Sequence, residues 1–181
     1  MASELPLVAL VDNERVRISV SSTLDRASSK RFLCDGNDDT CWSSAIPKVT
    51  ISRPSLPHTL TSTSLSLSQP NTPTTITLLW PHPHPGVLPR RIEFTFQGGF
   101  VGRTVSVFCL TAAAEWSLLT QVFPLDINAN QSFDLPSQGD TPVHSIRLVF
   151  ENGSDLNYGR IVLYRLQILG LEPTSAPPPA V

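Results

Sequence analysis

Five short stretches of this chain alternate apolar and polar residues, and this pattern leaves few folds open to it. The stretches contain Val16, Ile18 and Val20; Ile92, Phe94 and Phe96; Val105 and Val107; Ile146, Leu148 and Phe150; and Leu166 and Ile168. A period of two places these apolar side chains on one face of a strand, whereas an amphipathic helix needs a period near 3.6. Clusters of Gly, Asn, Asp and Pro separate the stretches. We therefore expect an all-β, antiparallel sandwich in which two sheets bury their inner faces against each other.

The composition argues for one domain and against two classes of partner. A chain of 181 residues is long enough for one domain with a proper core. Charged residues make up only 15%, the net charge is −2 and no dense Lys/Arg cluster occurs, so we expect neither a nucleic-acid nor a membrane partner. The first residues are acidic and their apolar run is interrupted by Pro6, which fits neither a signal peptide nor a membrane span. We expect a protein that is not secreted and is monomeric on its own.

Residues 33–44 (LCDGNDDTCWSS) hold the densest set of residues with special chemical requirements. Three carboxylates, an amide and a permissive glycine in residues 35–39 favour a tight turn and suit oxygen coordination of a hard cation. Trp42 follows this turn and could stack on a sugar, but a Trp at the start of a strand favours a structural role in the core. Asp38 and Asp39 are candidate contacts for a binding partner.

Residues 33–44, together with residues 92–103 (IEFTFQGGFVGR) and 152–170 (NGSDLNYGRIVLYRLQILG), resemble the discoidin or factor V/VIII C-type domain of the galactose-binding-like fold. With residues 123–136 (FPLDINANQSFDLP), they are similar to a small intracellular branch typified by the nuclear-receptor-associated repressor protein of animals. The resemblance covers roughly residues 16–172 and implies jelly-roll topology. Extracellular members tie their two ends together with a disulfide. Cys34, Cys41 and Cys109 are not placed to make it, so a reducing compartment is expected.

The resemblance also implies a calcium site, which this sequence alters. In many relatives the Asp of the DG pair, the Thr side chain and backbone carbonyls bind Ca²⁺; the matching residues here are Asp35 and Thr40, with Asp38 as an addition. Relatives complete the site with a glutamate on the last strand, where this chain has Arg165, which reverses the sign of the local field. We favour a loop without metal, and thus no cofactor, in which Arg165 or Arg160 bonds to Asp35. Calcium binding is the alternative.

Two other segments offer groups for binding a partner. Residues 152–160 (NGSDLNYGR) bring together Asp155, Tyr158 and Arg160, which supply charge, an amphipathic ring and a bidentate donor. The alternative is that Asp155 and Arg160 only satisfy the backbone of their own loop. Arg103 ends the stretch GGFVGR and could bind an anionic group.

Gly98 and Gly99, which open that stretch, are expected to shape a hairpin or a bulge, because no helix follows to make a phosphate site.

No catalytic constellation stands out. His82 and His84 have no third metal ligand at a sensible spacing, and no serine or cysteine nucleophile has a recognisable pattern around it. We therefore expect a non-enzymatic module that binds a protein through its end loops, as an adaptor in the nucleus or cytoplasm with a role in transcriptional regulation. A carbohydrate-binding, lectin-like module is the alternative.

The expected domain spans residues 15–172, after an N-terminal extension (1–14) and before a Pro-rich flexible tail (173–181). A Ser/Thr/Pro-rich insertion at about 53–73 interrupts it, because such a tract cannot bury enough apolar area to offset its ordering entropy. Residues 74–80 (TTITLLW) have the β-branched and aromatic content of a strand.

Overall fold

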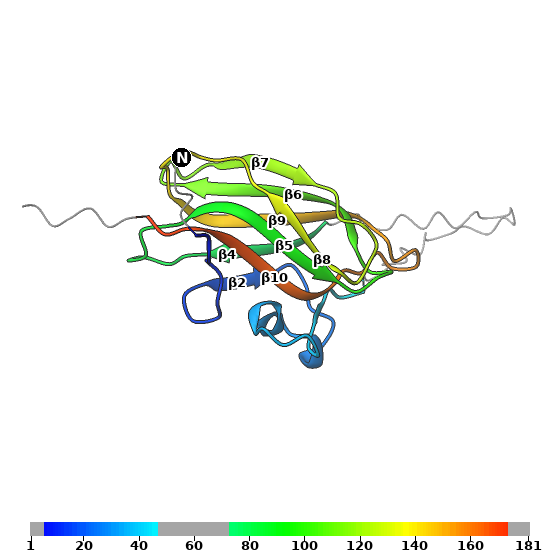
Figure 1. Ribbon diagram of the computed structural model, residues 1–181. Helices are drawn as coiled ribbons and strands as arrows, with labels where there is room; N and C mark the ends of the chain where they lie inside the picture. The colour runs from blue at the N-terminus through cyan, green and yellow to red at the C-terminus, as the bar shows by residue number, and fades with distance from the viewer. Residues whose placement is uncertain (1–5, 47–72, 174–181) are drawn as a thin grey trace, which may run out of the picture.

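Two antiparallel five-stranded sheets face each other in the computed structural model, which describes residues 6–46 and 73–173 (Figure 1). The first sheet has the order β1 (Val8–Ala9), β10 (Val162–Leu171), β5 (Leu88–Phe96) and β8 (Asn130–Asp134), and β3 (Trp42–Ser43) also pairs with β10. The second has the order β2 (Arg17–Val20), β4 (Thr74–Leu79), β9 (Val143–Gly153), β6 (Gly102–Thr111) and β7 (Trp116–Val122). Two 3-10 turns, η1 (Arg26–Ser28) and η2 (Lys30–Cys34), lie between β2 and β3. The predicted antiparallel jelly-roll sandwich is confirmed.

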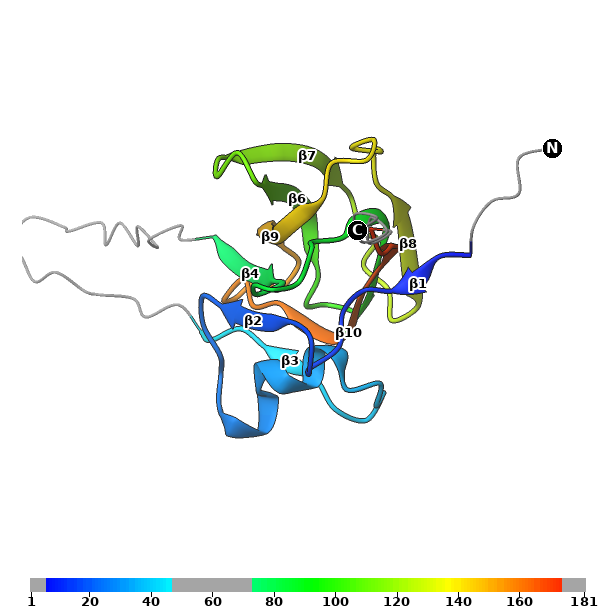
Figure 2. The ribbon, with the colours of Figure 1, turned by 90° about the vertical axis from the view of Figure 1, so that its left-hand side faces the viewer.

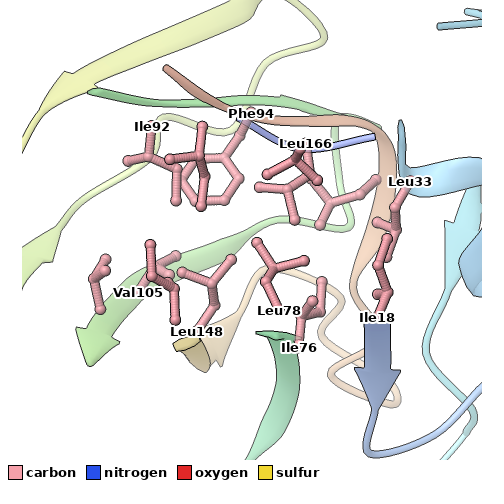
Figure 3. Packing of buried hydrophobic residues seen from close by; sticks show 14 of the residues in the cluster. Ile18, Leu33, Ile76, Leu78, Ile92, Phe94, Val105, Leu148 and Leu166 are labelled. Carbon is pink, nitrogen blue, oxygen red and sulfur yellow. The ribbon is translucent and has the colours of Figure 1, made fainter. Parts of the chain in front are cut away.

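The core lies between the two sheets, as the alternation predicts. In the second sheet the register aligns Ile76 and Val107 on either side of Leu148, and all three are fully buried. In the first sheet Phe94 pairs with Leu166, and their side chains face the second sheet (Figure 3). Burying one such side chain contributes roughly 1.5–3 kcal/mol, so these rows fix which face of each strand points inward.

The N-terminal segment belongs to the sandwich, which corrects the expected boundary at residue 15. Val8 and Ala9 pair with β10, Leu10 and Val11 are buried, and Trp80 Nε1 donates a hydrogen bond of 3.0 Å to the Leu10 carbonyl. Two residues are too few to show a period, which is why the alternation missed this strand. Strand β1 is labelled at the right in Figure 2; it forms one edge of the first sheet, next to β10, and β8 forms the other edge.

The predicted insertion lies outside the described residues, except for Pro73, and so do residues 174–181 of the predicted tail. The structure does show where the chain leaves and re-enters the sandwich around it. The Ala45 amide donates to Ser22 Oγ (3.1 Å) and the Thr75 amide donates to Ser21 Oγ (2.9 Å). Two adjacent serines thus hold both points close together. Among the residues with described structure, no helix is long and apolar enough to cross a membrane.

Candidate functional site

Three connections gather at one end of the sandwich: residues 97–101 between β5 and β6, residues 123–129 between β7 and β8, and residues 154–161 between β9 and β10. The register places them together, because Leu163 pairs with Phe96, Gly102 with Gly153 and Thr95 with Asn130. We call these three connections the loop end; it lies at the right in Figure 1.

The turn with Gly98 and Gly99 joins the two sheets, so the expected hairpin is wrong. Strand β5 belongs to the first sheet and β6 to the second, and Gly99 takes the left-handed conformation (φ +82°) that favours glycine. The Gly98 amide donates to Asn128 Oδ1 (2.5 Å) and the Gly99 amide to Asp126 Oδ1 (2.6 Å). The hydrogen bond from Gly99, assisted by Arg103 at 3.7 Å, lowers the pKa of Asp126 despite its partial burial. This turn is therefore bound tightly to residues 123–129.

Asp155 organises the connection between β9 and β10. Its carboxylate accepts hydrogen bonds from the amides of Asn157 (3.1 Å), Tyr158 (3.3 Å) and Arg160 (3.3 Å), and from Arg160 Nε (3.1 Å). Burial opposes ionisation of this carboxyl, but the hydrogen bonds, first that of the Arg160 side chain, outweigh it and lower the pKa of Asp155. The Arg160 guanidinium also lies over the Phe100 ring, 4.7 Å from its centroid. Asp155 and Arg160 thus face each other rather than solvent.

The loop end exposes large apolar side chains, Phe123 among them, as well as polar ones such as Asn128 and Asn157. Leu125, Ile127, Leu156 and Tyr158 are exposed, and Leu156 retains 93% of its accessible surface. We call these four residues the apolar tip. Only Tyr158 among them was predicted from the sequence; an apolar residue inside a polar turn, such as Leu156 between Asp155 and Asn157, was the available signal.

The acidic loop, residues 35–40, lies beside β10 and below the sandwich in Figure 1, apart from the loop end. Asp35 Oδ1 accepts from the Asn37 amide (3.0 Å) and Oδ2 accepts from Thr40 Oγ1 (2.7 Å). Arg165 Nη2 bonds to Asp38 Oδ1 at 2.7 Å.

The expected pairing of Asp35 with Arg165 or Arg160 is therefore wrong. Asp35 is satisfied within its own loop, Arg165 bonds to Asp38, and Arg160 bonds to Asp155. Asp39 is exposed.

Around this loop, Trp42 is fully buried and the cysteines are free thiols. Cys34 Sγ donates to the Leu166 carbonyl (3.3 Å), and burial, with Asp35 nearby, raises the pKa of the Cys34 thiol to about 12. Burial also raises the pKa of Cys41. Within residues 6–46 and 73–173, no three His, Cys, Asp or Glu side chains are grouped so that they could hold a metal ion.

Comparison with known proteins identifies relatives along most of the chain. No family model matches it. The nuclear receptor 2C2-associated protein of Danio rerio is 30% identical over 155 residues, which cover 83% of this chain and 88% of the relative. The protein of the same name from Homo sapiens is 27% identical over 157 residues, with the same coverage.

Solved structures with the same fold are more distant. A chitobiase fragment from Bacteroides thetaiotaomicron is 15% identical, with a TM-score of 0.64, and covers 97% of this chain and 99% of the fragment. The F5/8 type C domain of a Bacteroides fragilis protein is 11% identical (TM-score 0.61; 91% of this chain, 96% of that chain). A family 32 carbohydrate-binding module from Clostridium perfringens, in complex with galactose, is 13% identical (TM-score 0.57; 86% and 93%). At these identities the similarity shows the fold alone.

Proposed function

Because the chain belongs to the family of nuclear receptor 2C2-associated proteins, we propose that it is a non-enzymatic adaptor that binds a protein partner through its loop end. The relatives' name denotes association with a nuclear receptor, which supports a role in transcriptional regulation in the nucleus or cytoplasm. One structural neighbour is a carbohydrate-binding module and another is an F5/8 type C domain, and neither is a catalytic domain, which supports function by binding.

The observation that carries this proposal is that the charged groups of the loop end are paired, whereas its apolar tip is exposed. Its charged groups are paired: Asp155 with Arg160 within the loop end, and Asp126 with Arg103 of β6 and the Gly99 amide. The apolar tip is left facing solvent. Single exposed apolar residues are ordinary on a protein surface, but several on adjacent, hydrogen-bonded loops are typical of a site that buries them against another protein.

A sugar ligand fits this surface less well. Recognition of hydroxyl groups needs polar side chains that are free to bond to them and fixed in position. At the loop end Asn128 Oδ1 accepts from Gly98, and the Asp155 carboxylate accepts four hydrogen bonds from its own loop. Carbohydrate binding, known for one of the structural neighbours, is the alternative that an experiment must separate.

The test compares two aspartate substitutions in the apolar tip with one elsewhere. The double variant Leu125→Asp, Leu156→Asp places two charges in the proposed interface. The control variant Leu118→Asp alters a leucine of comparable exposure (54%, against 65% for Leu125) on β7, outside the loop end. All three substituted side chains are exposed, so the fold should survive in both variants, and circular dichroism checks this.

Affinity purification from cells of the source organism, with quantitative mass spectrometry, gives the readout. We expect a partner that the wild type and the Leu118→Asp variant retain equally and that the double variant loses at least tenfold. If the double variant retains every partner of the wild type, the loop end is not the interface. Binding to a glycan array that the double variant abolishes would establish the carbohydrate alternative instead.

A further inference from the structure

The acidic loop occupies the place where the resemblance implies a calcium ion, and its residues do not fit that ion. Calcium takes six to eight oxygen ligands whose lone pairs face the metal. Here Asp35 uses one oxygen for the Asn37 amide and the other for the Thr40 hydroxyl, and Asp38 is bonded to a guanidinium. We propose that the Arg165 guanidinium is the built-in cation of this loop, and that the loop takes no calcium because Arg165 bonds to Asp38 and offsets one of its three carboxylate charges.

A bulge in β10 directs Arg165 toward the loop. Leu163 pairs with Phe96 and Arg165 pairs with the next residue of β5, Thr95, so that Tyr164 is an extra residue in the ladder. After the fully buried Leu163, the next fully buried side chains of β10 are Leu166 and Ile168, a spacing of three followed by two. Without the extra residue, Arg165 would share the core face with Leu163. The bulge thus moves a charged side chain from the core face to the outer face.

The acidic loop is attached to β10 at both of its ends. Strand β3 pairs with the start of β10, with Trp42 opposite Leu163, and Cys34 Sγ bonds to the carbonyl of Leu166. Both ends of the loop are thereby fixed on β10, on either side of Arg165. The Arg165 side chain is 32% exposed and bonds at 2.7 Å to Asp38, whose side chain is 74% exposed, so the guanidinium occupies an oxygen of the loop that calcium would need.

Two substitutions at one position test the proposal. Arg165→Glu replaces the cation with a carboxylate, and Arg165→Gln removes the charge while it retains a polar side chain. The control is Arg91→Glu, because Arg91 also forms an ion pair with an aspartate in the first sheet, Asp134 at 2.9 Å, but outside the acidic loop. Each protein is melted in millimolar calcium chloride and in chelator, and calcium binding is measured by titration calorimetry.

The wild type and the Arg91→Glu variant should melt at the same temperature with calcium as with chelator. Both variants at residue 165 should bind calcium and melt at a higher temperature in its presence, because a ligand that binds the folded state stabilises it, and the effect should be larger for Glu. A wild type that calcium stabilises would overturn the proposal. The proposal would also be overturned if the folded Arg165 variants neither bound calcium nor melted at a higher temperature in its presence, because a different feature would then exclude the metal. If Arg165→Glu does not fold, the test depends on Arg165→Gln: calcium binding by this variant supports the proposal, and no binding overturns it.

Discussion

Replacing Asp155 with alanine should destabilise the protein strongly, because the side chain binds its whole loop. The Asp155 side chain is 6% exposed and accepts hydrogen bonds from three backbone amides and from Arg160, which is itself 24% exposed. Alanine leaves those amides without this acceptor and a partly buried guanidinium without its partner. Losses of this kind total roughly 2–4 kcal/mol. For a domain of this size that corresponds to a fall of about 5–15 °C in the melting temperature.

The matched control for this substitution is Asp134→Ala. Asp134 pairs with Arg91 at 2.9 Å, close to the 3.1 Å of Asp155 and Arg160, but the Asp134 side chain is 81% exposed. An exposed pair contributes about 0.5 kcal/mol or less, because water competes for both charges. Thermal and urea unfolding of the two variants gives the comparison. If Asp155→Ala costs no more than Asp134→Ala, Asp155 does not organise the loop.

Three further predictions follow from the described contacts. The stability difference between the wild type and the Asp155→Ala variant should be constant near neutral pH. Because the pKa of this carboxyl is lowered on folding, the difference should shrink as the pH falls through and below the ordinary aspartate range, and a difference that grows in acid would contradict this. Deleting residues 54–72 should change the melting temperature by no more than about 3 °C, since adjacent serines already hold the chain on both sides; loss of folding would refute the expectation. Cys34 should react with alkylating reagents far more slowly in the native protein than in urea, because its raised pKa keeps it as a thiol, and reductant should leave the melting temperature unchanged.

The strands of the core could be predicted because any strand with one buried face alternates apolar and polar residues along the sequence. Ile92, Phe94 and Phe96 alternate in the sequence and all three are buried in β5. Strand β7 could not be found this way. It lies at the edge of its sheet, and along it only Val122 is buried, so neither face imposes a period. The Gly98–Gly99 turn was predicted as a hairpin or a bulge because the local sequence does not say which sheet the next strand joins; that choice depends on pairing with β9.

The sequence indicated which loops carry functional groups, but not which side chains pair with each other or remain exposed in them. Arg165 meets Asp38 rather than Asp35 because Asp35 bonds within its own loop. The bulge that places Arg165 on the outer face adds one residue to a ladder, which has no signature in a single sequence. Leu125 and Leu156 are apolar and would count toward a core on composition alone. Their exposure arises because the sheets end where these residues begin, which is a property of the assembled sandwich.

The adjacent serines that flank the passage from β3 to β4 make this protein a convenient scaffold for engineering. Ser21 and Ser22 bond to the outgoing and returning chain directly after the end of β2, so we expect the pairing of β2 with β4 to be independent of how many residues lie between Ile46 and Pro73. A fluorescent domain or an affinity tag could be exchanged for those residues without altering the register of any strand. Thr74 pairs with Phe150 near the end of β9, so the cargo would emerge at the same end as the apolar tip. A reporter placed there would sense an arriving partner through space, without touching a residue of the interface.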